Sequence, residues 1–244
     1  MHNGLQLFGS VDTVARKLIA LKEMGVGHVM ALQNFGLLPQ KHVNASMERD
    51  RGAIVPESHF EFTMGGKWLE TLKEISPQLA RVAVLYDPKT APYAGSLLRS
   101  IAEAAPSFAI EPTDTPVQNA AETERVIEGF AQKSNGGLLV LPDVSTLNHR
   151  DLIIARAAQH RLPAVYPFRY FATSGGLVSY GIDSVDTYRQ VASYVDRILR
   201  GSKPADLPVQ APVKFELVIN AQTARKLGLT APPSLLARAD EVIE

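Results

Sequence analysis

The sequence predicts an α/β fold, a doubly wound lobe in which helices cover both faces of a parallel sheet. From about residue 60, short apolar segments alternate with helical segments of roughly a dozen residues, the pattern of successive βαβ units. Two of the predicted strands, 82–86 and 137–141, are almost entirely apolar, as expected for parallel strands buried on both faces. The chain has 244 residues, and 45% of them are hydrophobic, so it can bury a sizeable core.

The predicted elements of this lobe follow one another in a regular order. The expected helices span about 67–75, 93–104, 120–132, 148–160 and 168–173. The expected strands span about 82–86, 137–141, 163–166 and 176–180, and an extended stretch is expected around 109–116. Trp68, in the first of these helices, is interpreted as an anchor of the hydrophobic core.

The pattern changes after Asp183. A long amphipathic helix is expected over 187–200, and Gly201 is placed to end it. The alternating segment 214–219 predicts a strand, and Asn220 is placed to cap the next helix. A final short helix is expected to begin at the two prolines that follow.

The first 56 residues predict a separate αβα fragment. Ser10 is a suitable N-cap for a helix whose apolar residues recur at helical spacing up to Met24. A short buried strand is expected over 28–32, followed by a second short helix. Segment 51–58 contains glycine and proline without periodicity, which predicts a connector.

Composition excludes several classes of function. The formal net charge is +0, which gives no electrostatic reason to expect binding to nucleic acid or to an anionic membrane. Without cysteine there is no disulfide, thiol nucleophile or thiolate metal site. His28, His42 and His59 lack metal-ligand spacing, and Gly65–Gly66–Lys67 lacks the length of a phosphate-binding loop. We therefore expect no metal, no cofactor and no catalytic residues.

Candidate binding residues lie where the predicted strands end. Ligands of open parallel sheets bind beyond the carboxyl ends of the strands, and this edge is rich in Tyr, Phe and Asp. Such a set suits a small, partly apolar solute, including one that carries an amine. The residues expected to face the solute are Tyr93, Asp143, Phe168, Tyr180 and Asp183. In the alternative interpretation, aspartates such as Asp143 cap helices and the aromatic residues belong to the core.

Several segments carry a resemblance to a known family. They include KWLETLKEISPQLARVAVLYDP, NGGLLVLPD, RLPAVYPFRYF, GGLVSYGID and the closing stretch from YVDRILRG onward. From about Phe60 to Glu244, the chain resembles ABC transporter substrate-binding proteins, a family that includes tryptophan- and tyrosine-binding proteins. The resemblance implies a periplasmic-binding-protein type I fold, a small organic solute that is amino-acid-like, and an ABC permease and ATPase as partners.

The N-terminal segment departs from this family, whose members begin with a signal peptide and most of lobe one. Residues 4–56 resemble instead the C-terminal end of luciferase-like, flavin-dependent monooxygenases. The resemblances imply a gene fusion with three parts: a monooxygenase fragment (1–56), solute-binding lobe two (60–185) and a return segment of a truncated lobe one (186–244). Monooxygenase activity is not expected, since most of the barrel that holds the flavin is absent.

This division leads to further expectations. Without most of lobe one, the strand at 214–219 would lack neighbours, and its unpaired edges would favour self-association. Solute binding would be weak, because a single full lobe buries less of the solute than two lobes do. The family is periplasmic, but the sequence as written shows no signal peptide, which predicts a cytoplasmic chain. The alternative functions are a flavin-dependent monooxygenase fragment or a fusion product without function. A flavin absorption spectrum of the purified protein would support the monooxygenase.

Overall fold

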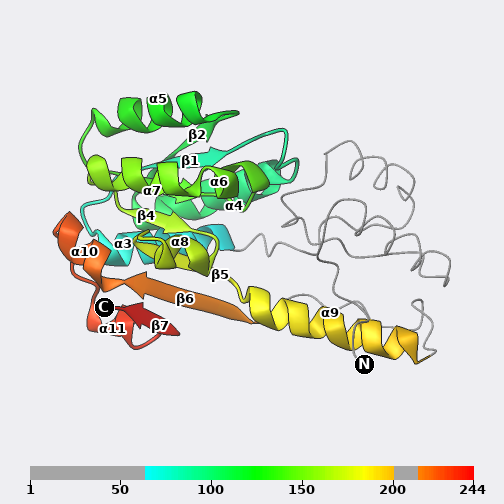
Figure 1. Ribbon diagram of the computed structural model, residues 1–244. Helices are drawn as coiled ribbons and strands as arrows, with labels where there is room; N and C mark the ends of the chain where they lie inside the picture. The colour runs from blue at the N-terminus through cyan, green and yellow to red at the C-terminus, as the bar shows by residue number, and fades with distance from the viewer. Residues whose placement is uncertain (1–63, 201–213) are drawn as a thin grey trace. The chain divides into compact units, whose positions relative to one another are not determined.

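The computed structural model describes residues 64–200 and 214–244 (Figure 1). The chain divides into two compact units, one made of residues 57–188 and 211–244 and the other of 1–56 and 189–210. The first unit contains a seven-stranded sheet with strand order β2-β1-β3-β4-β5-β6-β7. Its strands are β1 (Arg81–Tyr86), β2 (Glu111–Pro116), β3 (Gly136–Val140), β4 (Ala164–Tyr166), β5 (Val178–Ile182), β6 (Phe215–Asn220) and β7 (Glu241–Ile243). The α/β fold with a mostly parallel sheet is therefore confirmed.

Two groups of helices cover the two faces of this sheet (Figure 1). One face packs on α3 (Met64–Ile75), α4 (Ala94–Ala104), the 3-10 helix η2 (Ala105–Phe108), α10 (Ala221–Leu227) and α11 (Pro233–Leu236). The other packs on α5 (Ala120–Ala131), α7 (Arg150–Gln159) and α8 (Arg169–Thr173). The short helix α6 (Val144–Asn148) follows β3, and α9 (Ser184–Leu199) follows β5 and extends into the second unit.

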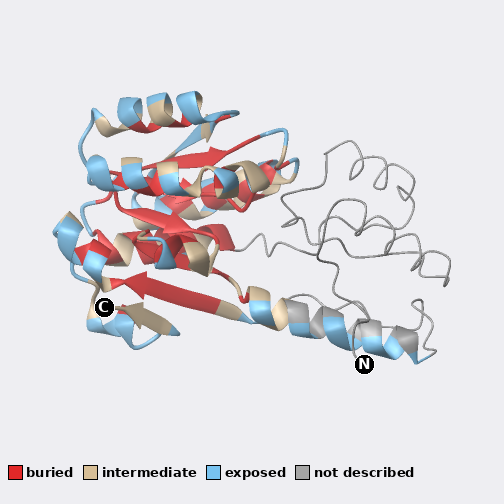
Figure 2. Cartoon of the chain, in the orientation of Figure 1, coloured by how far each residue is buried: buried red, intermediate tan, exposed pale blue. Residues whose placement is uncertain are grey.

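The apolar strands supply both layers of the core because successive side chains point to opposite faces. In β1, Val82 and Val84 belong to the cluster under α3 and α4, whereas Ala83 and Leu85 belong to the cluster under α5 and α7. Figure 2 shows the strands of the sheet as largely buried, with exposed residues on the outer faces of the helices. The doubly wound arrangement thus follows from inner strands such as β1 and β3, whose apolar residues are buried on both faces.

The strand at the predicted return segment does not lack neighbours, which corrects the expectation for 214–219. β6 pairs antiparallel with β5, with Tyr180 opposite Leu217, and parallel with β7 on its other side. Its central residues are buried, and Leu217 and Ile219 join the core under α3. The expectation was wrong because the edge of β5 and the last residues of the chain supply the partners.

Three other features differ from the sequence-based expectation. The helix expected over 148–160 is present as α7, but the short helix α6, which ends just before it at Asn148, was not predicted, and His149 between the two is outside helical geometry. β7 was not predicted, because three residues are too few for a periodic signal. α9 begins at Ser184, before the expected start at residue 187, because Asp183 caps it.

The αβα fragment and the resemblance to luciferase-like proteins fall on residues 1–56, outside the described residues, and remain predictions. Within the part of the chain that is described, no helix has the length and apolar character needed to span a bilayer.

Candidate functional site

A small hollow lies at the carboxyl edge of the sheet, the edge at which the sequence predicts a ligand. Its volume is about 20 Å³. Residues from the segments that follow β3 and β4, from the end of β5 and from the inner faces of α3 and α4 line it: Met64, Trp68, Leu97, Pro142, Pro167, Phe168, Gly181 and Ile182. The side chains of this lining are apolar. Since ligand pockets measure roughly 300–1,000 Å³, this hollow holds at most part of a solute.

Gly181 allows two strand ends to approach closely beside the hollow. A Cβ atom at this position would lie 1.8 Å from the carbonyl oxygen of Pro167. Only a residue without a side chain fits there, so the β5 backbone can lie against the segment that follows β4. This close contact sets the shape of the hollow.

Asp143 is buried at the start of α6, where it acts as the N-cap. One carboxylate oxygen accepts hydrogen bonds from the amides of Ser145 and Thr146 and from the Thr90 hydroxyl, the last at 2.8 Å. The other oxygen accepts a hydrogen bond from the amide of Asp87 at 3.1 Å. Both oxygens are therefore engaged by the protein, as in the capping interpretation, and the predicted contact with a solute amine remains a prediction.

Tyr93, the residue that directly precedes α4, lies beside Asp143. Its hydroxyl donates a hydrogen bond to the carbonyl oxygen of Pro142, the residue before Asp143. Burial, reinforced by the nearby Asp143 carboxylate, raises the pKa of the Tyr93 hydroxyl, which stays protonated at neutral pH. Together with Thr90, it ties the segment after β1 to the segment after β3. Thr90 could not be identified from local sequence, because its partner Asp143 is 53 residues away.

The other two predicted aromatic residues, besides Tyr93, lie in different places. Phe168, half-buried, lines the hollow and stacks on Tyr170 with ring centroids 5.2 Å apart. Tyr180 lies within β5, stacks on Phe215 at 6.1 Å and packs on the core under α3, outside the lining of the hollow. The structure therefore places Phe168, but not Tyr180, in the lining of the hollow, and the contact of either residue with a solute remains a prediction.

The structure confirms that Trp68 is buried in the core, and the Trp68 side chain also lines the hollow. It is 2% exposed, and its indole N–H donates a 2.7 Å hydrogen bond to the carbonyl oxygen of Tyr180. This bond joins α3 to β5 across 112 positions of sequence. Periodicity predicts that Trp68 is buried, but its partner is set by the tertiary structure alone.

Asp183 caps α9 and forms an ion pair. One oxygen accepts hydrogen bonds from the amides of Val185 and Asp186, and the other lies 2.8 Å from the Nζ atom of Lys214. The Lys214 ammonium, followed by the Asp186 amide, lowers the pKa of Asp183 below its ordinary value of 3.8. Its predicted contact with a solute remains a prediction.

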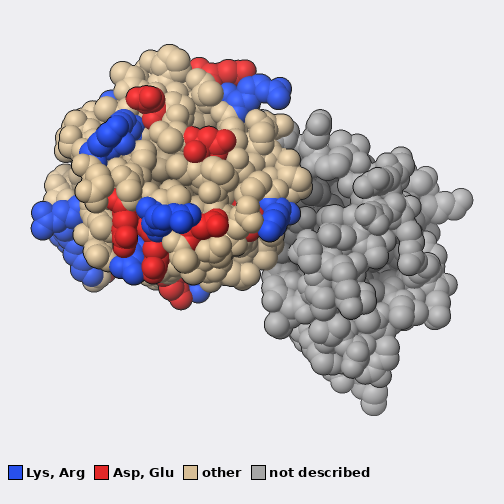
Figure 3. Space-filling model, turned by 90° about the horizontal axis from the view of Figure 1, so that it is seen from above, with Lys and Arg blue, Asp and Glu red and all other residues tan. Residues whose placement is uncertain are grey.

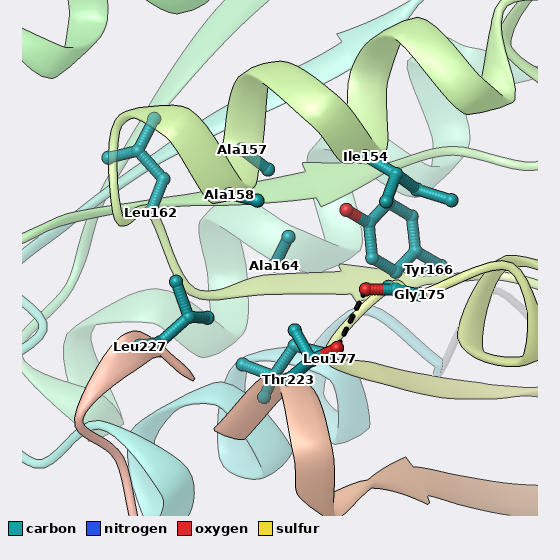
Figure 4. Close-up of a pocket in the computed structure, with 11 residues that line it drawn as sticks. Ile154, Ala157, Ala158, Leu162, Ala164, Tyr166, Gly175, Leu177, Thr223 and Leu227 are labelled. Carbon is teal, nitrogen blue, oxygen red and sulfur yellow. Dashed lines mark hydrogen bonds between the residues drawn. The ribbon is translucent and has the colours of Figure 1, made fainter. Parts of the chain in front are cut away.

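A second hollow, of about 10 Å³, lies where β4 and β5 begin, opposite to the predicted edge. It lies between α7, β4 and α10, and the Thr223 hydroxyl donates a 2.9 Å hydrogen bond to the carbonyl oxygen of Gly175 beside it (Figure 4). This volume corresponds to about one water molecule. The second hollow is smaller than the first, and it lies at the end of the strands opposite to the edge where ligands of parallel sheets bind.

The charged groups of the described residues suggest no alternative chemistry. On the face seen in Figure 3, acidic and basic side chains are interspersed. Among residues 64–200 and 214–244, no group of three or more acidic or histidine side chains is placed to hold a metal ion. The site is thus described by the apolar hollow and by the hydrogen-bonded turns that surround it.

Comparisons with solved structures support this fold. A conserved domain protein from Vibrio cholerae O1 biovar eltor is 29% identical, with a TM-score of 0.66. An ABC domain in complex with L-Trp from Streptococcus pneumonia is 22% identical, with a TM-score of 0.67. In both cases the similarity covers 73% of this chain and 60% of the other chain. At 18% identity and a TM-score of 0.54, the ligand-free, open structure of a substrate binding protein from Clostridium difficile also matches, over 72% of this chain and 59% of the other.

This chain therefore spans about 60% of the length of those solved structures. No curated protein matches it. The family model for ABC transporter substrate binding proteins matches residues 64–243, the same residues that form the sheet, its helices and the hollow at the carboxyl edge. The chain thus belongs to the ABC transporter substrate binding protein family.

Proposed function

We propose that this protein is the solute-binding component of an ABC-type uptake system and that the carboxyl edge of the sheet forms one wall of its solute site. The observation that carries the proposal is the apolar hollow between the ends of β3, β4 and β5. Its position matches the general location of ligands in open parallel sheets. The family consists of solute-binding proteins, which are not enzymes.

The chemistry of the hollow favours a solute with an apolar side chain. Phe168, Pro142 and Ile182 present carbon surface to it, which suits an aromatic or branched amino acid. The complex of the Streptococcus pneumonia domain with L-Trp gives an example in a protein of the same fold. Since both oxygens of Asp143 and of Asp183 are held by other groups of the chain, we assign the apolar part of the solute to this lobe.

The partners proposed for the protein follow from its family. An ABC permease and ATPase would receive the solute and move it across the membrane. Among the side chains whose burial the structure describes, Val185 and Leu236 are the large exposed hydrophobic ones, which gives little support to self-association through apolar surface.

The first experiment uses Trp68, the sole tryptophan of the sequence, as a built-in reporter. Because its indole lines the hollow, a bound solute changes its surroundings and hence its fluorescence. We expect L-leucine, L-isoleucine or L-phenylalanine to change the emission of the full chain in a saturable manner. Calorimetry with the same amino acids and with L-tryptophan gives the affinity.

Two phenylalanine variants test the position of the site. Phe168→Ala removes the aromatic ring from the hollow and should weaken binding about tenfold, the effect of losing one buried aromatic contact. Phe130→Ala is the matched control, because Phe130 lies on α5 under the Arg81 guanidinium and away from the hollow. Equal affinities of the two variants would place the site elsewhere, and the absence of any binding would contradict the proposed function.

A further inference from the structure

The division of the chain into two compact units changes after Pro56, after Tyr188 and before Ala211, and of these three places only the one after Tyr188 lies within the described residues. There the chain runs along α9, which starts directly after β5. The description resumes at Lys214, just before β6, which runs antiparallel to β5 in the same sheet. The start of α9 and the start of β6 are therefore neighbours, although residues 189–210 of the other unit lie between them in sequence.

Asp183 and Lys214 connect these two starts twice. The Asp183 amide donates a 3.0 Å hydrogen bond to the carbonyl oxygen of Lys214, and the Lys214 ammonium lies 2.8 Å from the Asp183 carboxylate. The same carboxylate holds the first turn of α9 through the amides of Val185 and Asp186. A single side chain thus contacts both the first turn of α9 and the residue that precedes β6.

The β6 side of this connection is itself anchored. Arg169 on α8 forms ion pairs with Glu216 of β6 and Glu241 of β7, which fix these strands to the body of the lobe. The Asp183 side chain is 12% exposed, whereas that of Lys214 is 55% exposed. The ion pair therefore connects the anchored strand β6 to the start of α9, with its carboxylate mostly buried and its ammonium group partly exposed to water.

We propose that the Asp183–Lys214 pair braces the start of α9 against the start of β6, so that these two segments move together when the protein captures its solute. The link to capture rests on the proposed function. Hinges between domains are formed by a few residues at the ends of elements, which is where this pair lies. Asp183, assigned by sequence to the solute, is then a positioning residue.

Amide hydrogen exchange of the full chain tests the brace without any solute. Lys214→Met keeps the aliphatic stem and removes the charge, and Asp183→Asn keeps a side chain that can cap α9. We expect each change to speed exchange in residues 185–187 by about two- to fivefold, the range for a partly exposed ion pair. The double variant should add little to either single change, the mark of a shared interaction.

Lys226→Met on α10 is the matched control, since Lys226 is an exposed lysine remote from the start of α9 in the element order. It should leave exchange in 185–187 unchanged. Unchanged exchange in Lys214→Met, or additive effects in the double variant, would overturn the proposal.

Binding of L-tryptophan to the same variants tests the consequence for capture. If the unmodified chain binds it, Lys214→Met should shift the affinity about two- to fivefold while Lys226→Met leaves it unchanged, because the brace biases the movement on which capture depends. Equal affinity in both variants would refute the role in capture. If the unmodified chain binds none of the amino acids, the proposed function fails, whereas the exchange data still decide whether the brace exists.

Discussion

The turn after β3 and the turn after β5 begin alike but serve different purposes. Each places an aspartate directly before a helix, and each aspartate accepts hydrogen bonds from amides of the first turn. The Asp143 carboxylate also accepts hydrogen bonds from two neutral donors, the Asp87 amide and the Thr90 hydroxyl. The Asp183 carboxylate instead forms an ion pair with the charged Lys214. The same local cap thus connects two loops of the lobe in the first case and the starts of α9 and β6 in the second.

The difference in partners predicts a difference in energy. A buried carboxylate with several neutral donors leaves all of them unsatisfied when it is removed, which is costly. An ion pair with a half-exposed lysine contributes little, because water screens it. We therefore expect the turn after β3 to matter more for stability and the turn after β5 more for movement.

The largest effect is expected for Asp143→Ala. This change leaves the amides of Ser145 and Asp87 without their acceptor, and we expect a loss of about 3 kcal/mol in the free energy of unfolding. Urea denaturation followed by circular dichroism measures it. Asp143→Asn, which still caps α6, should lose less than half as much. An Ala variant as stable as the unmodified chain would show that these bonds are dispensable.

Asp183→Ala should cost about 1.5 kcal/mol, since it removes a helix cap and one weak ion pair. The same denaturation experiment measures the loss. If it equals or exceeds the loss in Asp143→Ala, the proposed contrast between the two turns is wrong.

Tyr93→Phe sharpens the role of the first turn. It removes the hydroxyl that donates to Pro142 but keeps the ring, and should cost about 1 kcal/mol. Tyr180→Phe is a suitable comparison, because Tyr180 stacks within the sheet on Phe215 and lies outside the hollow. A fluorescence change of Trp68 in Tyr93→Phe, but not in Tyr180→Phe, would show that the altered turn reaches the hollow.

The smallest effect is the change in stability at acidic pH that is due to Asp183. Lys214 and the Asp186 amide lower the pKa of Asp183, so its contribution to stability is present above pH 3.8 and is lost as the pH falls through the lowered value. Asp183→Asn should therefore differ from the unmodified chain at neutral pH and converge with it as the pH falls below the lowered pKa of Asp183. A stability difference that is constant with pH would contradict the ion pair.

Glu216 is the opposite case in the same region. Burial is the main cause that raises the pKa of Glu216 above the ordinary 4.5. The Arg169 guanidinium lowers this pKa, and repulsion by the carboxylates of Asp183, Asp240 and Glu241 raises it. A raised carboxyl pKa means that stability falls as the pH rises through 4.5 toward the raised value. Glu216→Gln should remove this fall, which acid-range denaturation curves of the two proteins can show.

The sequence alone predicted most of the lobe because its signals are local. The apolar runs of β1 and β3 identify buried parallel strands, and the periodicity of α3, α4 and α5 identifies their covering helices. The ends of the strands then locate the edge where Pro142 and Phe168 lie, since that edge follows from the direction of the chain. None of these steps needs a distant contact.

The tertiary structure decided what each of these residues touches. The sequence could not show that β6 pairs with β5, that Trp68 bonds to Tyr180, or that Tyr180 lies outside the hollow. Nor could it distinguish Asp143 from Asp183, because each has the same place after a strand and before a helix. The partners that distinguish them, Thr90 and Lys214, come from other segments. Local sequence determines backbone conformation and burial, whereas the function of a polar side chain depends on neighbours that only the folded chain brings within hydrogen-bonding distance.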